Sequence, residues 1–416
     1  MRRTGWTLSL LLVAGLMGCN DGGGGGGGVG AAPQVFGEPI EGLTASEVAA
    51  FERGLVVFER RFTPSEGLGP RYNTTSCKNC HEVPTVGGSA TTYRNFFLVA
   101  VGTQGSQFAV PPAASIAFPS YGSSTQSTFQ LQDGRMVIPQ TFFGAPVTAA
   151  HRNALPLFGI GQFEFVTDAT ILSNADPDDA NGDGISGRVN FFLGSVGRFG
   201  VKCQSNNIEA FVRAPLNNQM GITSNPFLGG AGIVSLACSP VPALQAAGDP
   251  NTPTADNDGI PDPEMNTQDL GDLIAFTRFL APPRAKARSA AAERGKALFT
   301  SVGCAKCHLP SLPTSKGTTL EAFTDLLIHE MGSLADGISQ GVPQPSTLAG
   351  FTTGSEFRTA PLWGVSMHGP FLHDGRASTL AEAITMHDGE GLAAKTAFDA
   401  LTQQSKNDLV AFLESL

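Results

Sequence analysis

The chain has 416 residues, of which 26 are basic and 36 acidic, and its formal net charge at pH 7 is -10. This balance argues against nucleic acid as a partner, because a protein that binds phosphates needs clustered positive charge. About 390 residues follow Cys19, which is enough for two or three domains with cores of their own.

The N-terminal segment, residues 1–18, has the pattern of a lipoprotein signal peptide. It starts with two arginines, continues with an apolar run too short to span a bilayer, and ends in small residues before Cys19. The thiol of Cys19 can take a diacylglycerol, and residues 19–43 contain a run of glycines that suits a flexible tether. We therefore expect a protein of the bacterial cell envelope, held on the periplasmic or outer face of a membrane only through the lipid anchor on Cys19. An ordinary signal peptide followed by an incidental cysteine is the alternative.

An internal repeat organises the rest of the chain. Residues 52–58 and 293–299 both begin Glu-Arg-Gly and end in Phe, and each segment precedes a short cysteine motif. Residues 272–276 and 408–412 share the pattern Asp-Leu-x-Ala-Phe near the end of each half. The two halves therefore start and finish alike.

Both ends of the repeat are predicted to be helices. Thr44 and Glu47 have the spacing of a capping box, and apolar residues follow along one stripe as far as Phe62. Ser405 is the expected cap of the last helix, whose apolar residues run from Leu409 to Leu416.

The boundary between the halves is predicted at Pro282 and Pro283, because paired prolines stop a helix. The expected domains are therefore residues 44–283 and 284–416. The first is much the longer, so it should contain a large loop-rich insertion between about residues 82 and 263. Strand candidates in this insertion are residues 96–101 and 188–193.

Two short motifs carry the chemistry. Each places two cysteines three residues apart directly before a histidine, a spacing that suits covalent attachment of haem c through two thioethers with the imidazole on the iron. The first consists of Cys77, Cys80 and His81, and the second of Cys304, Cys307 and His308. Zinc bound by Cys-x-x-Cys pairs is the alternative.

Further segments accompany these motifs, at residues 67–73, 183–188, 220–223, 358–364 and 373–387. With them, nearly the whole chain after Cys19 resembles the di-haem oxidoreductase family, whose members are also named thiol oxidoreductases or di-haem peroxidases. This family is related to the bacterial di-haem cytochrome c peroxidases and to the methylamine-utilisation di-haem enzyme. The resemblance implies a mainly α fold of two tandem cytochrome-c-like domains, the first with the insertion, and two covalently bound haem c groups.

The resemblance also suggests the sixth ligand of the second haem. Related peroxidases place a methionine a few residues beyond the helix that follows a His-Asp-Gly turn, and His387 stands there in this chain. Two imidazoles would give a lower potential than an imidazole and a thioether. The alternatives are Met386, Met331 and His373.

For the first haem, His151 is the only histidine between His81 and the boundary. The iron therefore takes His151, takes a methionine such as Met220, or stays open. By resemblance, Gln162 and Glu164 match the glutamine and glutamate that the peroxidases hold above the peroxide-binding iron. Glu164 would then carry protons between the peroxide oxygens; the alternative is a surface or cap glutamate.

Two weaker features concern cysteines and calcium. Cys203 and Cys238 are expected to pair as a disulfide in an oxidising compartment. Residues 179–183 have the oxygen-ligand spacing that opens a calcium loop, but Asn190 stands where a closing glutamate belongs. Related enzymes hold calcium between their haems, so we expect a bound Ca2+ here, with solvated Asx turns as the alternative.

The function expected from these features is peroxide reduction at the first haem, with electrons delivered through the second by a small periplasmic cytochrome or cupredoxin. One alternative is a non-catalytic di-haem electron-transfer cytochrome. Another is a di-haem oxidase or oxygenase that acts on a protein or an organic substrate. The peroxidase and the oxidase both need a first haem iron with a free coordination position, whereas in the electron carrier a protein ligand fills that position.

Overall fold

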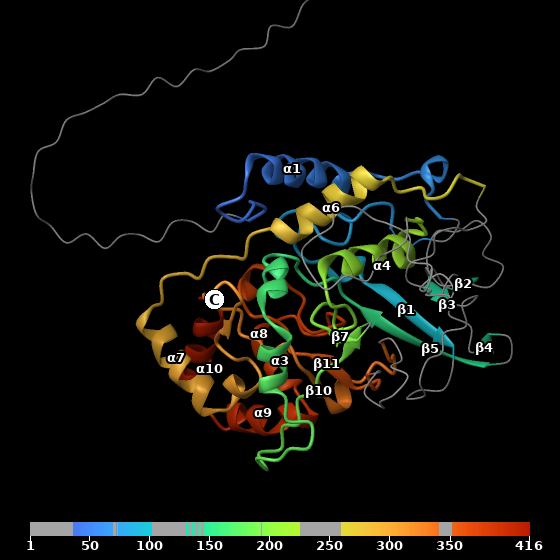
Figure 1. Ribbon diagram of the computed structural model, residues 1–416. Helices are drawn as coiled ribbons and strands as arrows, with labels where there is room; N and C mark the ends of the chain where they lie inside the picture. The colour runs from blue at the N-terminus through green and yellow to red at the C-terminus, as the bar shows by residue number, and fades with distance from the viewer. Residues whose placement is uncertain are drawn as a thin grey trace, which may run out of the picture. The chain divides into compact units, whose positions relative to one another are not determined.

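The computed structural model is described here for part of the chain (Figure 1). Residues 33–416 form one compact unit, so the division predicted near residue 283 stays a prediction. Cys19, Cys238 and the start of the tether lie outside the described residues. No helix of the described part is long and apolar enough to cross a membrane. The described residues are 36–69, 72, 74–101, 130–132, 135–137, 141–142, 145–192, 194–224, 259–340 and 352–416.

Helices dominate the regular structure, as expected for a mainly α protein. Thr44 and Glu47 form the predicted capping box before α1. The last helix is capped by Thr402 and not by Ser405, whose backbone N–H donates to the Thr402 side chain. The α-helices are α1 (Ala45–Glu59), α3 (Asp168–Asn174), α4 (Ile208–Met220), α6 (Thr267–Phe279), α7 (Ala290–Ser301), α8 (Leu380–Thr385), α9 (Leu392–Asp399) and α10 (Gln403–Leu413).

Short antiparallel strands accompany the helices. The largest sheet among the described residues has the order β1-β5-β4, from Phe96–Val101, Ala145–Arg152 and Thr141–Phe142. The strand predicted at residues 96–101 is therefore confirmed, whereas of the described residues 188–192 only Phe191–Phe192 (β6) form a strand. The remaining pairs are β2 (Gln130–Gln132) with β3 (Arg135–Val137), β6 with β7 (Ser195–Val196), β8 (Leu312–Pro313) with β9 (Thr319–Leu320), and β10 (Ile328–Glu330) with β11 (Glu356–Arg358).

The first helix, α1, packs against α6, the helix that closes the first half of the chain (Figure 1). The helices cross at Gly54, where an added Cβ would lie 1.9 Å from the carbonyl oxygen of Asp272. Beside this crossing Arg53 donates two hydrogen bonds of 2.8 Å to the Asp272 carboxylate. Gln268 donates a third hydrogen bond to this carboxylate. The helix pair is therefore held by a close backbone approach and by hydrogen bonds to Asp272.

The second half repeats this arrangement with α7 and α10. An added Cβ on Gly295 would again lie 1.9 Å from a carbonyl oxygen, that of Asp408. Arg294 donates to both oxygens of the Asp408 carboxylate, at 2.7 and 2.8 Å, and Gln404 donates to one of them. The repeat read from the sequence is thus also a repeat of contacts.

Two apolar clusters form the core around these helix pairs. In the first, Phe58 packs against Phe276 at a ring-centroid distance of 4.8 Å. In the second, Phe299 packs against Phe412 at 5.3 Å. Trp363, although it comes from the second half, belongs to the first cluster.

Candidate functional site

The first cysteine motif forms a tight turn that presents His81. The backbone N–H groups of Cys80 and His81 both donate to the carbonyl of Cys77, which curls the motif after α1. The Nδ1 atom of His81 lies 2.9 Å from the carbonyl oxygen of Gly88. Because a carbonyl can only accept, Nδ1 carries the hydrogen, and Nε2 keeps its lone pair for a metal. Burial lowers the pKa of His81, so the ring is neutral, as a ligand must be.

The second motif repeats this geometry. The 3-10 helix η4 (Cys304–Lys306) leads into His308, whose Nδ1 lies 3.0 Å from the carbonyl oxygen of Phe323. Its Nε2 is therefore also left for a metal. Burial, reinforced by the nearby His387, lowers the pKa of His308 to about 4 despite the hydrogen bond to Phe323. The packing matches as well, because Phe58 lies 6.0 Å from the His81 ring and Phe299 lies 6.4 Å from the His308 ring.

Both proximal histidines have the geometry that haem needs, and the described residues form no tetrahedral zinc site. Of the described residues, one group of three side chains is close enough to share a metal ion, namely Cys307, Asp325 and His329. Both ring nitrogens of His329 are already bonded to carboxylates, of Glu390 at 2.6 Å and of Asp325 at 2.9 Å. This imidazole has no lone pair to offer, which leaves too few donors for a tetrahedral zinc site.

His387 has the orientation expected of an axial ligand. It follows α8, and its Nδ1 lies 2.8 Å from the carbonyl oxygen of Ala383, one helical turn earlier. The carbonyl contact is thus made through Nδ1, as in His81 and His308, and the nearby His387 adds to the effect of burial in lowering the pKa of His308. Ligation by His387 stays a prediction that this geometry supports.

The alternative ligand His373 lies elsewhere. Its ring stacks on Phe357 at a centroid distance of 4.1 Å, and its carbonyl oxygen accepts from the Asn153 backbone in the first half. The His373 Nε2 atom is buried without a hydrogen-bond partner. Met386 caps the end of α8, and Met331 precedes the 3-10 helix η5 (Gly332–Leu334).

The two candidate sixth ligands of the first haem differ in burial. His151 is exposed on β5, next to the buried Arg152, because successive side chains of a strand face opposite sides. Met220, the last residue of α4, is 2% exposed and belongs to the first core cluster with Leu68 and Cys77. Burial therefore favours Met220 over His151 as a ligand from the described residues.

Gln162 and Glu164 share the 3-10 helix η3 (Ile160–Phe165), but their contacts differ. The Glu164 carboxylate receives hydrogen bonds from Arg278 Nε at 2.7 Å, from Arg278 Nη2 at 3.2 Å and from the Ile208 backbone at 2.9 Å. To carry a proton, Glu164 would have to release some of these bonds. The Gln162 Nε2 atom is buried and has no hydrogen-bond partner.

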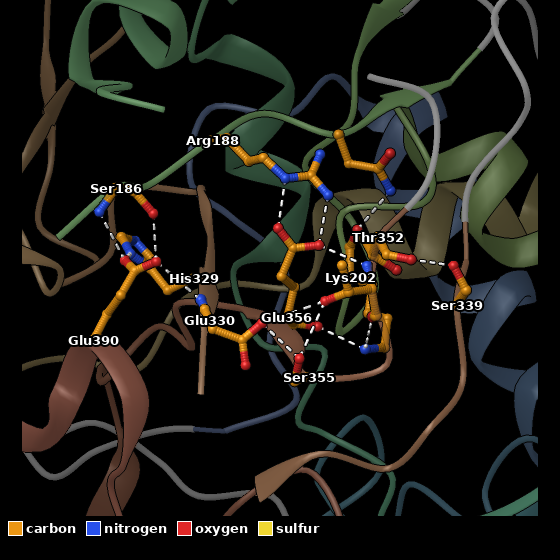
Figure 2. A network of polar contacts seen from close by, with 12 residues as sticks. Ser186, Arg188, Lys202, His329, Glu330, Ser339, Thr352, Ser355, Glu356 and Glu390 are labelled. Carbon is orange, nitrogen blue, oxygen red and sulfur yellow. Dashed lines mark hydrogen bonds and ion pairs between the residues drawn. The ribbon is translucent and has the colours of Figure 1, made fainter. Parts of the chain in front are cut away.

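A polar network joins the Asp-Gly-Ile-Ser-Gly-Arg segment to the second half (Figure 2). Ser186 donates to Glu390 through its backbone and its hydroxyl, and Arg188 binds both oxygens of Glu356. The fully buried Lys202 donates to the Glu356 carbonyl at 2.6 Å. This segment was noticed in the sequence only by resemblance, and its partners are more than 150 residues away.

Cys203 and the acidic loop at residues 179–183 both lie in the described part of the chain. Cys203 is a free thiol, fully buried, and its sulfur donates to the Leu326 carbonyl; Cys238 lies outside the described residues. The Asp179 carboxylate accepts backbone N–H groups of its own loop, as in Asx turns, and Asp183 pairs with Lys306 at 3.0 Å. Calcium binding stays a prediction.

Several known proteins are similar in sequence to parts of this chain. A profile for the family described as "Di-haem oxidoreductase, putative peroxidase" matches residues 126–416, which include the second motif and start after the first. The methylamine utilization protein MauG of Methylorubrum extorquens is 32% identical over 133 residues, covering 30% of this chain and 34% of the relative. The cytochrome-c peroxidase IdrP1 of Denitromonas iodatirespirans is 30% identical over 173 residues, covering 34% and 44%.

These alignments span less than half of either relative. The solved structure of a MauG-like protein associated with microbial copper homeostasis overlaps 62% of this chain and 89% of its own. The identity is 16% and the TM-score 0.29.

Proposed function

Since the chain belongs to the di-haem oxidoreductase family, we propose that it is an exported enzyme of the cytochrome c peroxidase type. In this proposal peroxide is reduced to water at the first haem, and both electrons arrive through the second. Cys77 and Cys80 would hold the first haem and Cys304 and Cys307 the second. When bound, each haem supplies the iron that stores electrons and, at the first site, the place for peroxide.

One observation carries this proposal, the asymmetry between the two motifs. At the second motif the imidazole of His387 lies close enough to His308 to add to the effect of burial in lowering its pKa, whereas the histidine in the same half as the first motif, His151, is exposed on β5. A second imidazole closes an iron to ligands, whereas an iron without a sixth protein ligand can bind peroxide. The asymmetry therefore supports electron entry at the second motif and chemistry at the first.

The residues of η3 have separate roles in this proposal. Gln162 offers a buried amide without a partner, which suits a hydrogen bond to a ligand of the first haem. Glu164 fixes η3 against α4 and α6 through Ile208 and Arg278, so it would position Gln162. This differs from the acid–base role that the resemblance implies, because the Glu164 oxygens are already engaged.

The cellular setting is part of the same proposal. A lipid on Cys19 would tether the chain to the cell envelope, and the donor would be a small periplasmic cytochrome or cupredoxin. The excess of acidic over basic residues, 36 to 26, supports a donor with a basic docking face, because opposite charges speed encounter.

Burial of Met220 favours one competing function, a di-haem electron carrier in which this thioether closes the first iron. Spectra of the purified holoprotein and of Met220→Leu separate the two functions. A high-spin ferric signal in the wild type that peroxide removes supports the peroxidase. A low-spin first haem that becomes high-spin only in Met220→Leu supports the carrier.

A further inference from the structure

The buried imidazole of His329 connects the segment that orients His308 with the segment that carries His387. The Phe323 carbonyl orients His308, and two residues later the Asp325 carboxylate accepts from His329 Nε2 at 2.9 Å. The other Asp325 oxygen accepts the Leu327 backbone N–H at 2.9 Å, which fixes this carboxylate in its own turn. His329 is thus attached to the segment that holds the proximal ligand.

The opposite nitrogen of His329 holds the segment that carries His387. Glu390 lies three residues after His387, and its Oε2 atom is 2.6 Å from His329 Nδ1 (Figure 2). Glu390 also accepts from the Ser186 backbone at 3.0 Å, the Ser186 hydroxyl at 2.6 Å and the Glu330 backbone at 3.1 Å. This carboxylate is therefore the anchor of the segment beyond His387.

The His329 ring is enclosed and charged. It is 4% exposed, and an added Cβ on Gly187 would lie 2.7 Å from its Cε1 atom. Burial alone would lower the pKa of His329, but contacts with Asp325, with the Cys307 sulfur and with Glu390 raise it to about 12. Only the protonated imidazole can donate from both nitrogens at once, so the ring links two carboxylates that would otherwise repel.

We propose that His329 is a positioning residue that ties the segment orienting His308 to the segment carrying His387, and so fixes the two axial ligands of the second haem relative to each other. The inference rests on the proposed function in one respect, that His387 is the sixth ligand. Charge-assisted hydrogen bonds are short and directional, which suits them to setting a distance between segments.

Loss of the His329 hydrogen bonds to Asp325 and Glu390 should make His387 more mobile and leave the second haem covalently attached. His308 does not depend on Glu390 for its place, since Phe323 holds it, and the Cys307 sulfur contacts His329 only loosely, at 3.9 Å. Without His329 the Glu390 carboxylate keeps Ser186 and Glu330 but loses its link to Asp325. The expected result is easier displacement of His387 from the iron.

The test uses the holoprotein and the binding of cyanide to the second haem, followed with its electron paramagnetic resonance spectrum. His387→Ala first establishes the ligand, because it should abolish the low-spin signal of that haem. His329→Leu and Glu390→Gln should then bind cyanide at least about tenfold faster than the wild type, with both haems still covalently attached. His329→Gln, which can donate to only one carboxylate, should also bind faster and serves if His329→Leu does not accumulate. Ser355→Ala is the matched control, and should match the wild type because the Ser355 hydroxyl donates to Glu330 and not to Glu390.

The outcomes separate the tie from the coordination on which it rests. If His387→Ala loses the low-spin signal but His329→Leu, His329→Gln and Glu390→Gln bind cyanide at the wild-type rate, the tie is refuted and the coordination stands. If His387→Ala keeps the wild-type spectrum, His387 is not the ligand, and both the proposed coordination and the tie are overturned.

Discussion

Replacing Glu164 by glutamine should destabilise the protein without abolishing its chemistry. The Glu164 side chain is 4% exposed and that of Arg278 is 8% exposed, so the pair is shielded from water. Removing one partner of such a pair leaves a buried charge and costs about 3–5 kcal/mol. The amide oxygen of glutamine can still accept from Ile208 or from Arg278, so we expect a loss near ~3 kcal/mol.

Urea unfolding with linear extrapolation measures this loss, and an unchanged denaturant slope would show that the folded state keeps its compactness. Arg278→Gln is the matched control and should be destabilised similarly. The double variant should lose less than the sum of the two, because the residues act on each other. Peroxide turnover per folded molecule should fall only slightly, because the amide keeps one of these bonds and η3 still holds Gln162 near its place. Full stability of Glu164→Gln together with a fall in turnover of roughly a hundredfold or more would refute the reasoning and make Glu164 the proton carrier.

Gly54→Ala and Gly295→Ala should each lower the free energy of unfolding by about 1–3 kcal/mol in urea, because the new Cβ meets a backbone carbonyl; wild-type stability of either would contradict the crossing. The Cys203 thiol should resist alkylation until unfolding, because burial raises its pKa to about 12; rapid labelling of its peptide in mass spectra of the folded protein would contradict its burial. Arg294 lowers the pKa of Asp408 below 3.8, so the stabilising effect of this carboxylate is complete above that value and is lost as pH falls through the folded pKa. Calorimetry should therefore find Asp408→Asn less stable than the wild type near neutral pH but not in strong acid, and a deficit independent of pH would refute the pairing.

The parts of the fold that were predicted correctly depend on neighbours in the sequence. The capping box of Thr44 and Glu47 joins residues three positions apart, and it marks the start of α1 correctly. The error at α10 has a local cause too, since Thr402 and Ser405 are both good caps three positions apart. Spacing alone cannot decide between two such hydroxyl residues.

The sequence points to the candidate site through two short motifs and misses the side chains that depend on distant partners. Each cysteine motif is a local turn, and haem attachment at His81 and His308 stays a prediction. Glu164 could not be assigned to a buried pair, since its partner Arg278 is 114 residues away. His329 was overlooked for the same reason, although a carboxylate four residues before it and a glutamate soon after His387 were visible signals.

In the proposed function the first haem iron is open to peroxide, whereas the second is closed by His387. Visible and electron paramagnetic resonance spectra of the holoprotein, oxidised and half-reduced, with and without hydrogen peroxide, test this difference. We expect a high-spin ferric signal that disappears on addition of peroxide, beside a low-spin signal that His387→Ala removes. Two low-spin haems that do not respond to peroxide in any redox state would refute the peroxidase and identify an electron carrier.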